Sequence, residues 1–442
     1  MLVNKKKPNA LVRWIMAAMV MGIAVGYACH ALAPDAAAAR DIARYFNIAT
    51  DVFLRMIKMV VAPLVFATLV AGIASMGDAR AVGRVGAKAL GWFVSASLVS
   101  LALGLVFVNL LQPGASLGLP LPDVGAATHL KTASLNLADF VTQLVPTSIA
   151  QAMSTNAILQ ILVFSLFFGF AISALPREAT ATTVRFVDEL VVIMLKLTDF
   201  VMKFAPVGVF AAIASVITTQ GLGVLVTYGK FIGGFYLGLA VLWLVLAGVG
   251  AACLGARPMV RLLRLLREPT LIAFSTASSE SAYPKMMEQL KAFGVRQRIA
   301  SFVLPLGYSF NLDGSMMYQA FAAVFVAQAF GIEMSLGTQI TMLLVLMVSS
   351  KGIAGVPRAS LVVVAAVLPM FGLPEAGLLL IMGIDQFLDM GRTATNVIGN
   401  GIASAVVAKW EGGLRTDGGV DEEEDEVATT AGVPQAVPAL VA

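Results

Sequence analysis

The stretch DQFLDMGRTATNVIGN, residues 385–400, decides the fold because charged side chains lie within otherwise apolar sequence. GLLLIMGI (377–384) precedes it and IASAVVAKW (402–410) follows it, so the region is long enough for a membrane-spanning helix. Charges that face lipid would cost several kcal/mol each, so its polar side chains must face the protein interior or a water-filled cavity. At about 100° per residue they fall on one stripe of the helix: Asp385, Asp389, Arg392, Thr393, Asn396 and Asn400.

The composition places the chain among integral membrane proteins. Of its 442 residues 59% are hydrophobic and 13% are charged, and the mean hydropathy is +0.87. Soluble domains average about 45–50% apolar and about 25% charged residues. Nucleic-acid binding would need a basic, solvated surface, which the sequence does not offer. The two histidines and two cysteines lack the spacing of metal ligands, so we expect no metal site and no bound cofactor.

Long apolar segments in the first part of the chain alternate with loops of different charge. Basic residues cluster before the first segment, between the second and third, and after the fourth and sixth. By the positive-inside rule, the N-terminus and the end of the sixth segment are cytoplasmic. Residues 1–33 also fit a secretory signal, but the length of the apolar run favours a first membrane span. The segments lie near residues 11–33, 47–75, 87–111, 157–175, 187–217 and 225–255.

In the C-terminal part, two apolar stretches are broken at their centres by small and polar residues. Residues 258–292 carry AFSTASSESAYPKM and residues 336–371 carry SSKGIAGVPRAS. Each arm of about 12–16 residues is shorter than the ~20 that a span needs. Basic residues flank both ends of the first stretch only, so we expect two re-entrant hairpins that enter from opposite faces. Each is followed by an apolar segment with a polar interruption, GYSFNLDGS (307–315) in the first case and the opening stretch in the second. This inverted repeat predicts an all-α integral membrane protein with a site between the hairpins.

The polar stripe either ties helices together as an Asp–Arg network or binds a ligand, and the two hairpins opposite it favour a ligand. Arg392 is permanently charged and offers a planar fork that suits a carboxylate. Hairpin tips of small residues expose backbone N–H groups, which also suit anions. Asp389, one turn before Arg392, offers a partner for an ammonium group. These residues predict a small ligand with carboxylates and an amine, such as an acidic amino acid. A plain dicarboxylate would be repelled by Asp389 unless that aspartate were protonated.

Four motifs carry a resemblance to a known family. ASSES (277–281), NLDGS (311–315), SKGIAGVP (350–357) and DMGRTATNVIGN (389–400), in this order and spacing, resemble the dicarboxylate/amino acid:cation symporters, the glutamate transporter family. The similarity runs from Leu11 to about Glu411, and the chain looks most similar to the bacterial proton-coupled glutamate/aspartate symporters.

The resemblance implies an architecture and an activity. It implies eight transmembrane helices plus two re-entrant helical hairpins, and a homotrimer in the bacterial inner membrane with both termini cytoplasmic. The activity implied is that of a secondary active symporter, not an enzyme, that imports glutamate or aspartate by an elevator mechanism. C4-dicarboxylate symport and sodium coupling are the alternatives within the family.

The resemblance also divides the chain into parts. Residues 1–86 (spans 1 and 2) and 113–217 (spans 4 and 5) would form a static scaffold for trimerisation. A mobile transport domain would consist of 87–112 (span 3), 218–256 (span 6) and 257–411 (both hairpins with spans 7 and 8). The acidic segment 412–442 is expected to be a disordered cytoplasmic tail.

Site residues carry over from the motifs. Arg392 would bind the side-chain carboxylate of the substrate with help from Ser315, and Asp389 would bind its amine. The second hairpin tip at Val356 would close over the substrate. The α-carboxylate and neighbouring polar groups would be held by Thr393, Asn396, Ser278 and Ser279. Cation coupling or its supporting network would use Glu280, Gly307, Asn311, Asp313, Asp385 and Asn400.

Several departures from the family pattern favour protons over sodium as the coupling ion. Asn400 stands where sodium-coupled relatives usually have an aspartate ligand, and Phe93 and Ala96 stand where they have Tyr and Thr ligands. Glu280 adds a carboxylate that many of them lack, and Arg358 replaces a common glycine at the second tip. Carboxylates are retained while sodium ligands are lost, and a partly buried carboxylate can be tuned to titrate near neutrality.

Two other functional classes compete with a symporter. An ion channel could be lined by the polar stripe. A membrane-embedded hydrolase could use Ser278 or Ser279 as its nucleophile, but that serine would need a neighbouring base. The only histidines, His30 and His129, are far from both serines in the sequence. The symporter therefore stays the favoured class.

Overall fold

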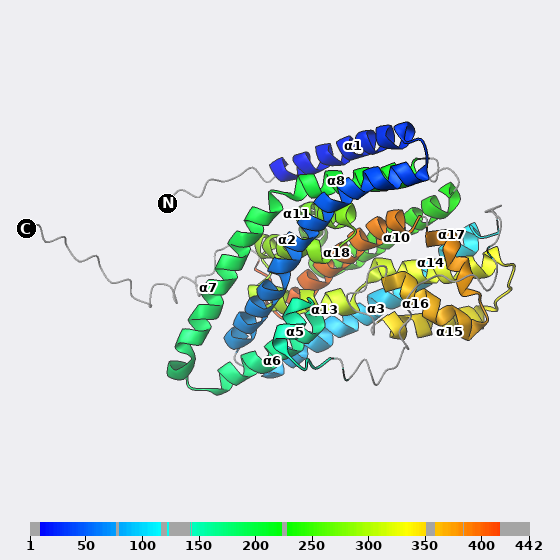
Figure 1. Cartoon of the computed structure of the whole chain (residues 1–442). Coiled ribbons are helices and arrows are strands. Elements are labelled where there is room, and N and C mark those ends of the chain that lie inside the picture. Colours follow the sequence, from blue (N-terminus) through cyan, green and yellow to red (C-terminus); the bar gives the residue numbers. More distant parts are fainter. Residues whose placement is uncertain are drawn as a thin grey trace, which may run out of the picture.

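The computed structural model describes residues 9–76, 79–115, 122, 142, 144–222, 228–350, 359–382 and 384–415. Most of these residues are helical, and the β-structure found among them is one isolated bridge between Val295 and Leu414. In this described part, four helices are long and apolar enough to cross a membrane, or five if one bent pair counts as a single span. Figure 1 shows these helices packed side by side. The prediction of a largely helical membrane protein is confirmed.

One group of helices is built around α2 and comes from the N-terminal part of the chain. It comprises α1 (Asn9–Leu32), α2 (Ala36–Met76), α5 (Ile149–Ser154), α6 (Ile158–Ala174), α7 (Arg177–Met202) and α8 (Ala205–Gln220). Helix α2 packs on α6, α7 and α8, and α1 packs on α8. Gly22 and Gly26 permit this close approach, because a Cβ at Gly26 would lie 2.7 Å from the carbonyl oxygen of Ala214.

The apolar stretch 187–217, which the sequence predicts as one span, is bent. Helices α7 and α8 meet at an angle of 50° between Met202 and Ala205. Pro206, in the first turn of α8, explains the break because proline has no N–H to continue the preceding helix and favours the start of a new one. Helix α6 has 17 residues, fewer than the ~20 needed for a straight crossing.

A second group of helices surrounds α18 (Asp385–Trp410), which contacts α3, α10, α11, α13 and α14. In Figure 1, α18 passes through the interior of the helix assembly beside α10. The other long members are α3 (Ala79–Leu111), α10 (Gly229–Leu254), α11 (Ala256–Thr276), α12 (Tyr283–Phe293), α13 (Gln297–Phe310), α14 (Asp313–Ala329), α15 (Leu336–Ser349) and α16 (Ala359–Val367). The short members are α17 (Leu379–Met382) and the 3₁₀ helices η1 (Glu280–Ala282), η3 (Leu368–Phe371) and η4 (Glu375–Leu378).

Both predicted hairpins correspond to pairs of helices. Helices α11 and α12 form the first, and the chain reverses near Ala277, which adopts a left-handed backbone conformation with φ of 48°. Helix α11 has 21 residues, so the predicted arm length of about 12–16 is wrong for it. The reason is that its arginine-rich first half, which is not apolar, is helical too. Helices α15 and α16 contact each other and form the second hairpin. Its tip, 351–358, including Val356 and Arg358, lies outside the described residues.

Each segment that follows a hairpin is broken. The first break lies inside the predicted polar interruption, and the second lies before it. Helix α13 ends at Phe310 and α14 starts at Asp313, so the first break lies inside the NLDGS motif. The expectation that 377–384 continues into the same helix as 385–400 is wrong. Those residues form the end of η4 and the single turn of α17, and α18 begins afresh at Asp385. Asp385 therefore lies in the first helical turn, where a negative charge complements the helix dipole.

The end of α18 is tied to α3 by the side chain of Glu411, and to the turn between α12 and α13 by the backbone that follows it. Arg84 Nε lies 2.9 Å from Glu411 Oε2, and Lys88 Nζ lies 2.6 Å from Oε1. Lys88 also donates to the carbonyl oxygen of Trp410 at 2.9 Å. Beyond Glu411, the backbone N–H of Arg415 donates to the carbonyl oxygen of Gly294 at 3.0 Å. The start of α3, the end of α18 and the turn between α12 and α13 are thus held together, and we call this arrangement the C-terminal clasp.

We expect the C-terminal clasp to open in acid. Burial raises the pKa of the Glu411 carboxyl, but hydrogen bonds and charges from Lys88 and Arg84 outweigh this and hold its pKa below the usual range. A carboxyl with a lowered pKa stabilises the folded state above its ordinary pKa, and that contribution disappears as the pH falls through the lowered value. The rings of Trp92 and Trp410 are 5.9 Å apart, so tryptophan emission reports the opening. Glu411→Gln should lose most of this acid transition, and an unchanged transition would contradict the assignment.

Candidate functional site

The polar stripe predicted on residues 385–400 faces the interior. Asp385, Arg392, Thr393, Asn396 and Asn400 are each at most 4% exposed. The middle of α18 is also enclosed, because every residue from Met390 to Ala408 is buried. The charged side chains of this helix therefore meet other protein groups rather than lipid.

Arg392 lies between two carboxylates of its own helix. Its Nε donates to Asp389 Oδ1 at 2.7 Å, and its Nη1 donates to Asp385 Oδ1 at 3.2 Å. Thr393 Oγ1 also donates to Asp389 Oδ1, at 3.1 Å. Asp389 is the accessible member, with 21% of its side chain exposed against 3% for Arg392. Several polar atoms of this network pair with one another, but none of its hydrogen bonds to described residues uses Nη2 of Arg392.

Tyr318 belongs to this network although the sequence interpretation did not single it out. Its hydroxyl donates to Asp385 Oδ1 at 2.9 Å, and the guanidinium carbon of Arg392 lies 4.4 Å from the centre of its ring. The ring face attracts the cation, and the hydroxyl fixes the carboxylate that holds it. Its position one turn after Ser315 of the NLDGS motif is the sequence signal that could have identified it.

The start of α14 is joined to the middle of α18 by Asn396. Asn396 Oδ1 accepts from the backbone N–H groups of Gly314 and Ser315 at 2.9 and 3.3 Å, and its Nδ2 donates to Ser315 Oγ at 3.2 Å. These N–H groups have no partner inside the helix because they belong to its first turn. A broken helix therefore places its positive end beside the Arg392 network, with Ser315 in its first turn.

A second polar cluster lies one to two turns further along α18. Asn311, Asp313 and Asn400 are at most 1% exposed, and Asn311 Nδ2 donates to Asn400 Oδ1 at 3.2 Å. Gly307 and Gly399 allow this packing, because a Cβ at Gly307 would overlap Asn400 Oδ1 and one at Gly399 would overlap Asp313 Oδ2. Side-chain oxygens from three positions thus converge here. Such oxygens can coordinate a hard cation, but only one of the three positions is a carboxylate, and the Asn400 oxygen already accepts from Asn311.

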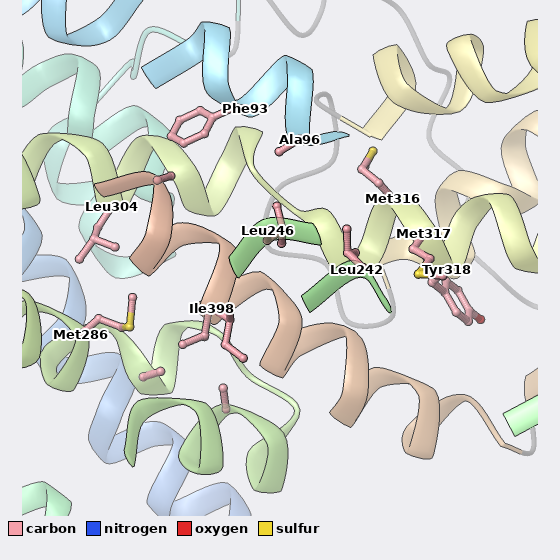
Figure 2. Close-up of a cluster of buried hydrophobic side chains, with 14 of the residues drawn as sticks. Phe93, Ala96, Leu242, Leu246, Met286, Leu304, Met316, Met317, Tyr318 and Ile398 are labelled. Carbon is pink, nitrogen blue, oxygen red and sulfur yellow. The ribbon is translucent and has the colours of Figure 1, made fainter. Parts of the chain in front are cut away.

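Phe93 of α3 lies beside this second cluster. Its Cζ atom would be 3.5 Å from a Cβ at Gly307, which itself faces Asn400. Figure 2 shows Phe93 and Ala96 on α3, turned toward the buried side chains of the neighbouring helices. Both residues are at most 5% exposed. At this point α3 therefore presents an apolar ring and a methyl group to its neighbours. Neither group has an oxygen that could bind a cation.

The tip of the first hairpin is near α18, and the hydrogen bonds of its two serines to described residues stay within the hairpin. Ser278 and Ser279 are partly exposed, and the carbonyl oxygen of Ser278 accepts from Ser281 Oγ at 2.7 Å. Ala277 at the turn packs into an apolar cluster with Met390 of α18 and Ile213 of α8. In the described part, no hydrogen bond joins the two tip serines to Arg392, Asp389 or Asn396, although the sequence groups all five in one site.

Glu280 follows the tip serines and lies close to the other group of helices. It is partly buried and interacts electrostatically with Lys58 of α2. Glu280 thus belongs to the contact between the first hairpin and α2.

Two aromatic residues of α10 position α18, and the sequence interpretation missed both. Trp243 Nε1 donates to Thr395 Oγ1 at 2.7 Å, and the Tyr236 hydroxyl donates to the carbonyl oxygen of Phe387 at 2.6 Å. These bonds fix the rotation of α18 about its axis and so keep Asp389 and Arg392 on the inner side. In the described part of the chain, no group of three His, Cys, Asp or Glu side chains could hold a metal ion.

Comparison with known proteins agrees with this arrangement. Residues 11–410 match the sodium:dicarboxylate symporter family. The chain is 41% identical over 409 residues to a proton/glutamate-aspartate symporter of Escherichia coli K12, which covers 90% of this chain and 92% of that protein. It is 39% identical over 376 residues to a proton/sodium-glutamate symport protein of Bacillus caldotenax, covering 84% and 89%. It is 38% identical over 418 residues to C4-dicarboxylate transport protein 2 of Polaromonas naphthalenivorans, covering 93% and 91%. The chain belongs to the sodium:dicarboxylate symporter family.

Proposed function

We propose that the protein is a secondary active symporter that imports glutamate or aspartate together with protons. The observation that carries the proposal is the buried Arg392, held by Asp385 and Asp389 with one arm of its guanidinium group left for a substrate carboxylate. The relative with 41% identity is named a proton/glutamate-aspartate symporter, which agrees with this assignment.

The substrate is proposed to bind along the inner face of α18. Its side-chain carboxylate would pair with Nη2 of Arg392, which gives a charge-assisted bond in a water-poor site. Its ammonium group would pair with the accessible carboxylate of Asp389. Ser315 would help Arg392 to bind the side-chain carboxylate. Thr393 and Asn396 would hold the α-carboxylate, and Ser278 and Ser279 would reach it once the hairpin tip shifts. Val356 of the second tip would cover the substrate.

Proton coupling is proposed because the second cluster is a poor sodium site. Asn400 supplies a neutral amide instead of a carboxylate, and α3 places the ring of Phe93 beside Gly307. Candidate proton carriers are Glu280, Asp313, Asp385 and Asp389. One relative is named for both protons and sodium, so a sodium-coupled version is the competing possibility.

Movement of one helix group against the other is proposed as the transport step. The group around α18 would be the mobile transport domain, and the group around α2 would be the scaffold of a homotrimer with eight spans and two re-entrant hairpins. The contacts between Ala277 and Ile213, and between Glu280 and Lys58, cross from one group to the other and would have to separate during this motion. A bacterial inner membrane and cytoplasmic termini complete the proposal.

Uptake into proteoliposomes tests the proposed function directly. An inward proton gradient without sodium should drive accumulation of labelled aspartate above its external concentration, and a protonophore should abolish it. An ion channel would only equilibrate the label. A requirement for sodium under these conditions would overturn the assigned coupling ion.

Replacement of Asp389 is expected to separate the two substrate classes. Asp389→Ala should weaken aspartate and glutamate binding roughly thirty- to a thousandfold, because the ammonium group loses its charged partner. Succinate and malate have no ammonium group and should lose less than about tenfold. Competition of each compound against labelled aspartate in proteoliposomes measures the difference.

Asp389→Asn is the matched control for that comparison, because it keeps an oxygen for Arg392 and Thr393 and removes only the charge. It should reproduce the selective loss of amino acids. An equal loss for amino acids and dicarboxylates in both variants would remove the amine-binding role and favour the activity named for the C4-dicarboxylate relative.

A further inference from the structure

An exposed row of arginines runs along α11, the first arm of hairpin 1. The spacing of four, three and three residues places all four on one side of the helix, and all four are exposed. The opposite side carries the buried residues Met259, Leu262 and Leu266. We call this row the arginine face, and its members are Arg257, Arg261, Arg264 and Arg267.

Within the described residues, few groups offset the positive charge of the arginine face. Arg261 Nη2 donates to the carbonyl oxygen of Ala292 at 3.0 Å and lies over the ring of Phe293, and Arg267 Nε donates to the carbonyl oxygen of Arg264 at 3.2 Å. Within the described ranges, no carboxylate forms an ion pair with any of the four arginines. Four like charges spaced along one helix side repel one another and attract an acidic partner.

The described chain ends beside this face. Arg415 N–H donates to the carbonyl oxygen of Gly294, which is two residues from Ala292, the backbone partner of Arg261. Consecutive Cα atoms are about 3.8 Å apart, so two such steps and the two hydrogen bonds place the end of the C-terminal clasp within roughly 20 Å of the Arg261 guanidinium group.

The segment that follows has the complementary charge and a suitable length. DEEEDE, residues 421–426, begins six positions after Arg415, a distance that an extended chain covers in roughly 20 Å. Arg257 and Arg267 are separated by ten positions, or about 15 Å along a helix. Six extended residues span about the same distance, so the acidic run can cover the whole arginine face.

We propose that the acidic run 421–426 docks on the arginine face of α11. Exposed ion pairs are individually weak, but several in a row on a short tether act at a high effective concentration. Docking would neutralise the arginines of hairpin 1 and keep them from the anionic headgroups of the membrane. Since the contact is electrostatic and solvent-exposed, salt should weaken it.

Disulfide trapping tests the docking without depending on transport activity. Val260 is 48% exposed beside the arginines and Val427 directly follows the acidic run, so Val260→Cys with Val427→Cys leaves every charge in place. The full-length protein would carry both changes with Cys29→Ser and Cys253→Ser. Phe186→Cys with Val427→Cys is the matched control, because Phe186 is 61% exposed but lies on α7.

We expect the Val260 pair to form a disulfide at least tenfold faster than the Phe186 pair at low salt. Replacing the six acidic residues by their amides, or adding salt, should remove this advantage. The tail changes lie outside the described fold, and an unchanged elution profile shows that folding is intact. Equal rates for the two pairs would overturn the proposal. So would a rate for the Val260 pair that changes neither when the six acidic residues are replaced by amides nor when salt is added.

Nanodiscs distinguish the tail from the membrane as the occupant of the arginine face. The Val260 pair should form its disulfide in phosphatidylcholine discs and keep doing so in phosphatidylglycerol discs. Loss of the disulfide only in phosphatidylglycerol would show that anionic headgroups, and not the tail, occupy the face, and the proposal would be wrong.

Discussion

Arg392→Lys is expected to reduce transport of amino acids and dicarboxylates alike, by roughly a hundred- to a thousandfold. The guanidinium group reaches Asp389 through Nε and Asp385 through Nη1, while Nη2 is left for substrate. A lysine ammonium is a single point charge and cannot serve two carboxylates in these directions and a third from the substrate. A substrate carboxylate left without its partner in a buried site costs about 2–5 kcal/mol, and each 1.4 kcal/mol is a tenfold change.

Binding and uptake should both report this loss. Calorimetry on the purified protein measures substrate affinity, and proteoliposome uptake measures transport. Arg185→Lys is the control, because Arg185 is 79% exposed and pairs only with Glu189 in the described part of α7. It should keep full activity. If Arg392→Lys binds aspartate as tightly as the unaltered protein, Arg392 does not bind the substrate carboxylate.

Gly314→Ala is expected to abolish transport and to lower thermal stability strongly. A Cβ at this position would overlap the carbonyl oxygen of Arg392 and lie 2.7 Å from its Cα atom. Both are backbone atoms of α18, so no side-chain rotation can make room. Helix α14 would have to move away, which breaks the bonds from Gly314 and Ser315 to Asn396. Overpacking of this kind costs about 1–3 kcal/mol or more in stability.

Gly91→Ala is the matched control for this substitution. Gly91 lies within α3, and a Cβ there would have no protein atom within 4 Å. Alanine should therefore be neutral or stabilise the helix by roughly 0.5–1 kcal/mol. Melting temperature in detergent and aspartate uptake measure both variants. If Gly314→Ala and Gly91→Ala have the same melting temperature and the same uptake, the close contact between α14 and α18 limits neither stability nor transport.

The inner face of α18 could be predicted from the sequence, because charged side chains that face lipid cost too much free energy and must therefore face protein. Asp385, Asp389, Arg392 and Asn396 had to share one side of a helix and face protein, and they do. The break inside NLDGS was predictable for a similar reason, since polar and small residues at that depth need partners within the protein. Their roles in binding stay predictions.

Other contacts could not be predicted because they depend on how distant helices rotate against each other. The bond between Trp243 and Thr395 joins residues 152 positions apart, and Tyr318 meets Asp385 across 67. An aromatic residue in an apolar helix gives no sign of whether it faces lipid or a polar neighbour. Pro206 did signal the bend between α7 and α8, but the continuous apolar run on both sides masked it.

The enclosure of α18 between Met390 and Ala408 has a consequence for how this gene tolerates variation. A helix with one face on lipid accepts many apolar exchanges along that face, so its mutational record shows a periodic pattern of permissive sites. Between Met390 and Ala408 no such permissive face exists, because every position is in contact with protein. A library of all single substitutions, selected for growth on aspartate, should therefore show an unbroken intolerant block there, and a repeating tolerant pattern in α1, where residues such as Val20 are 65% exposed.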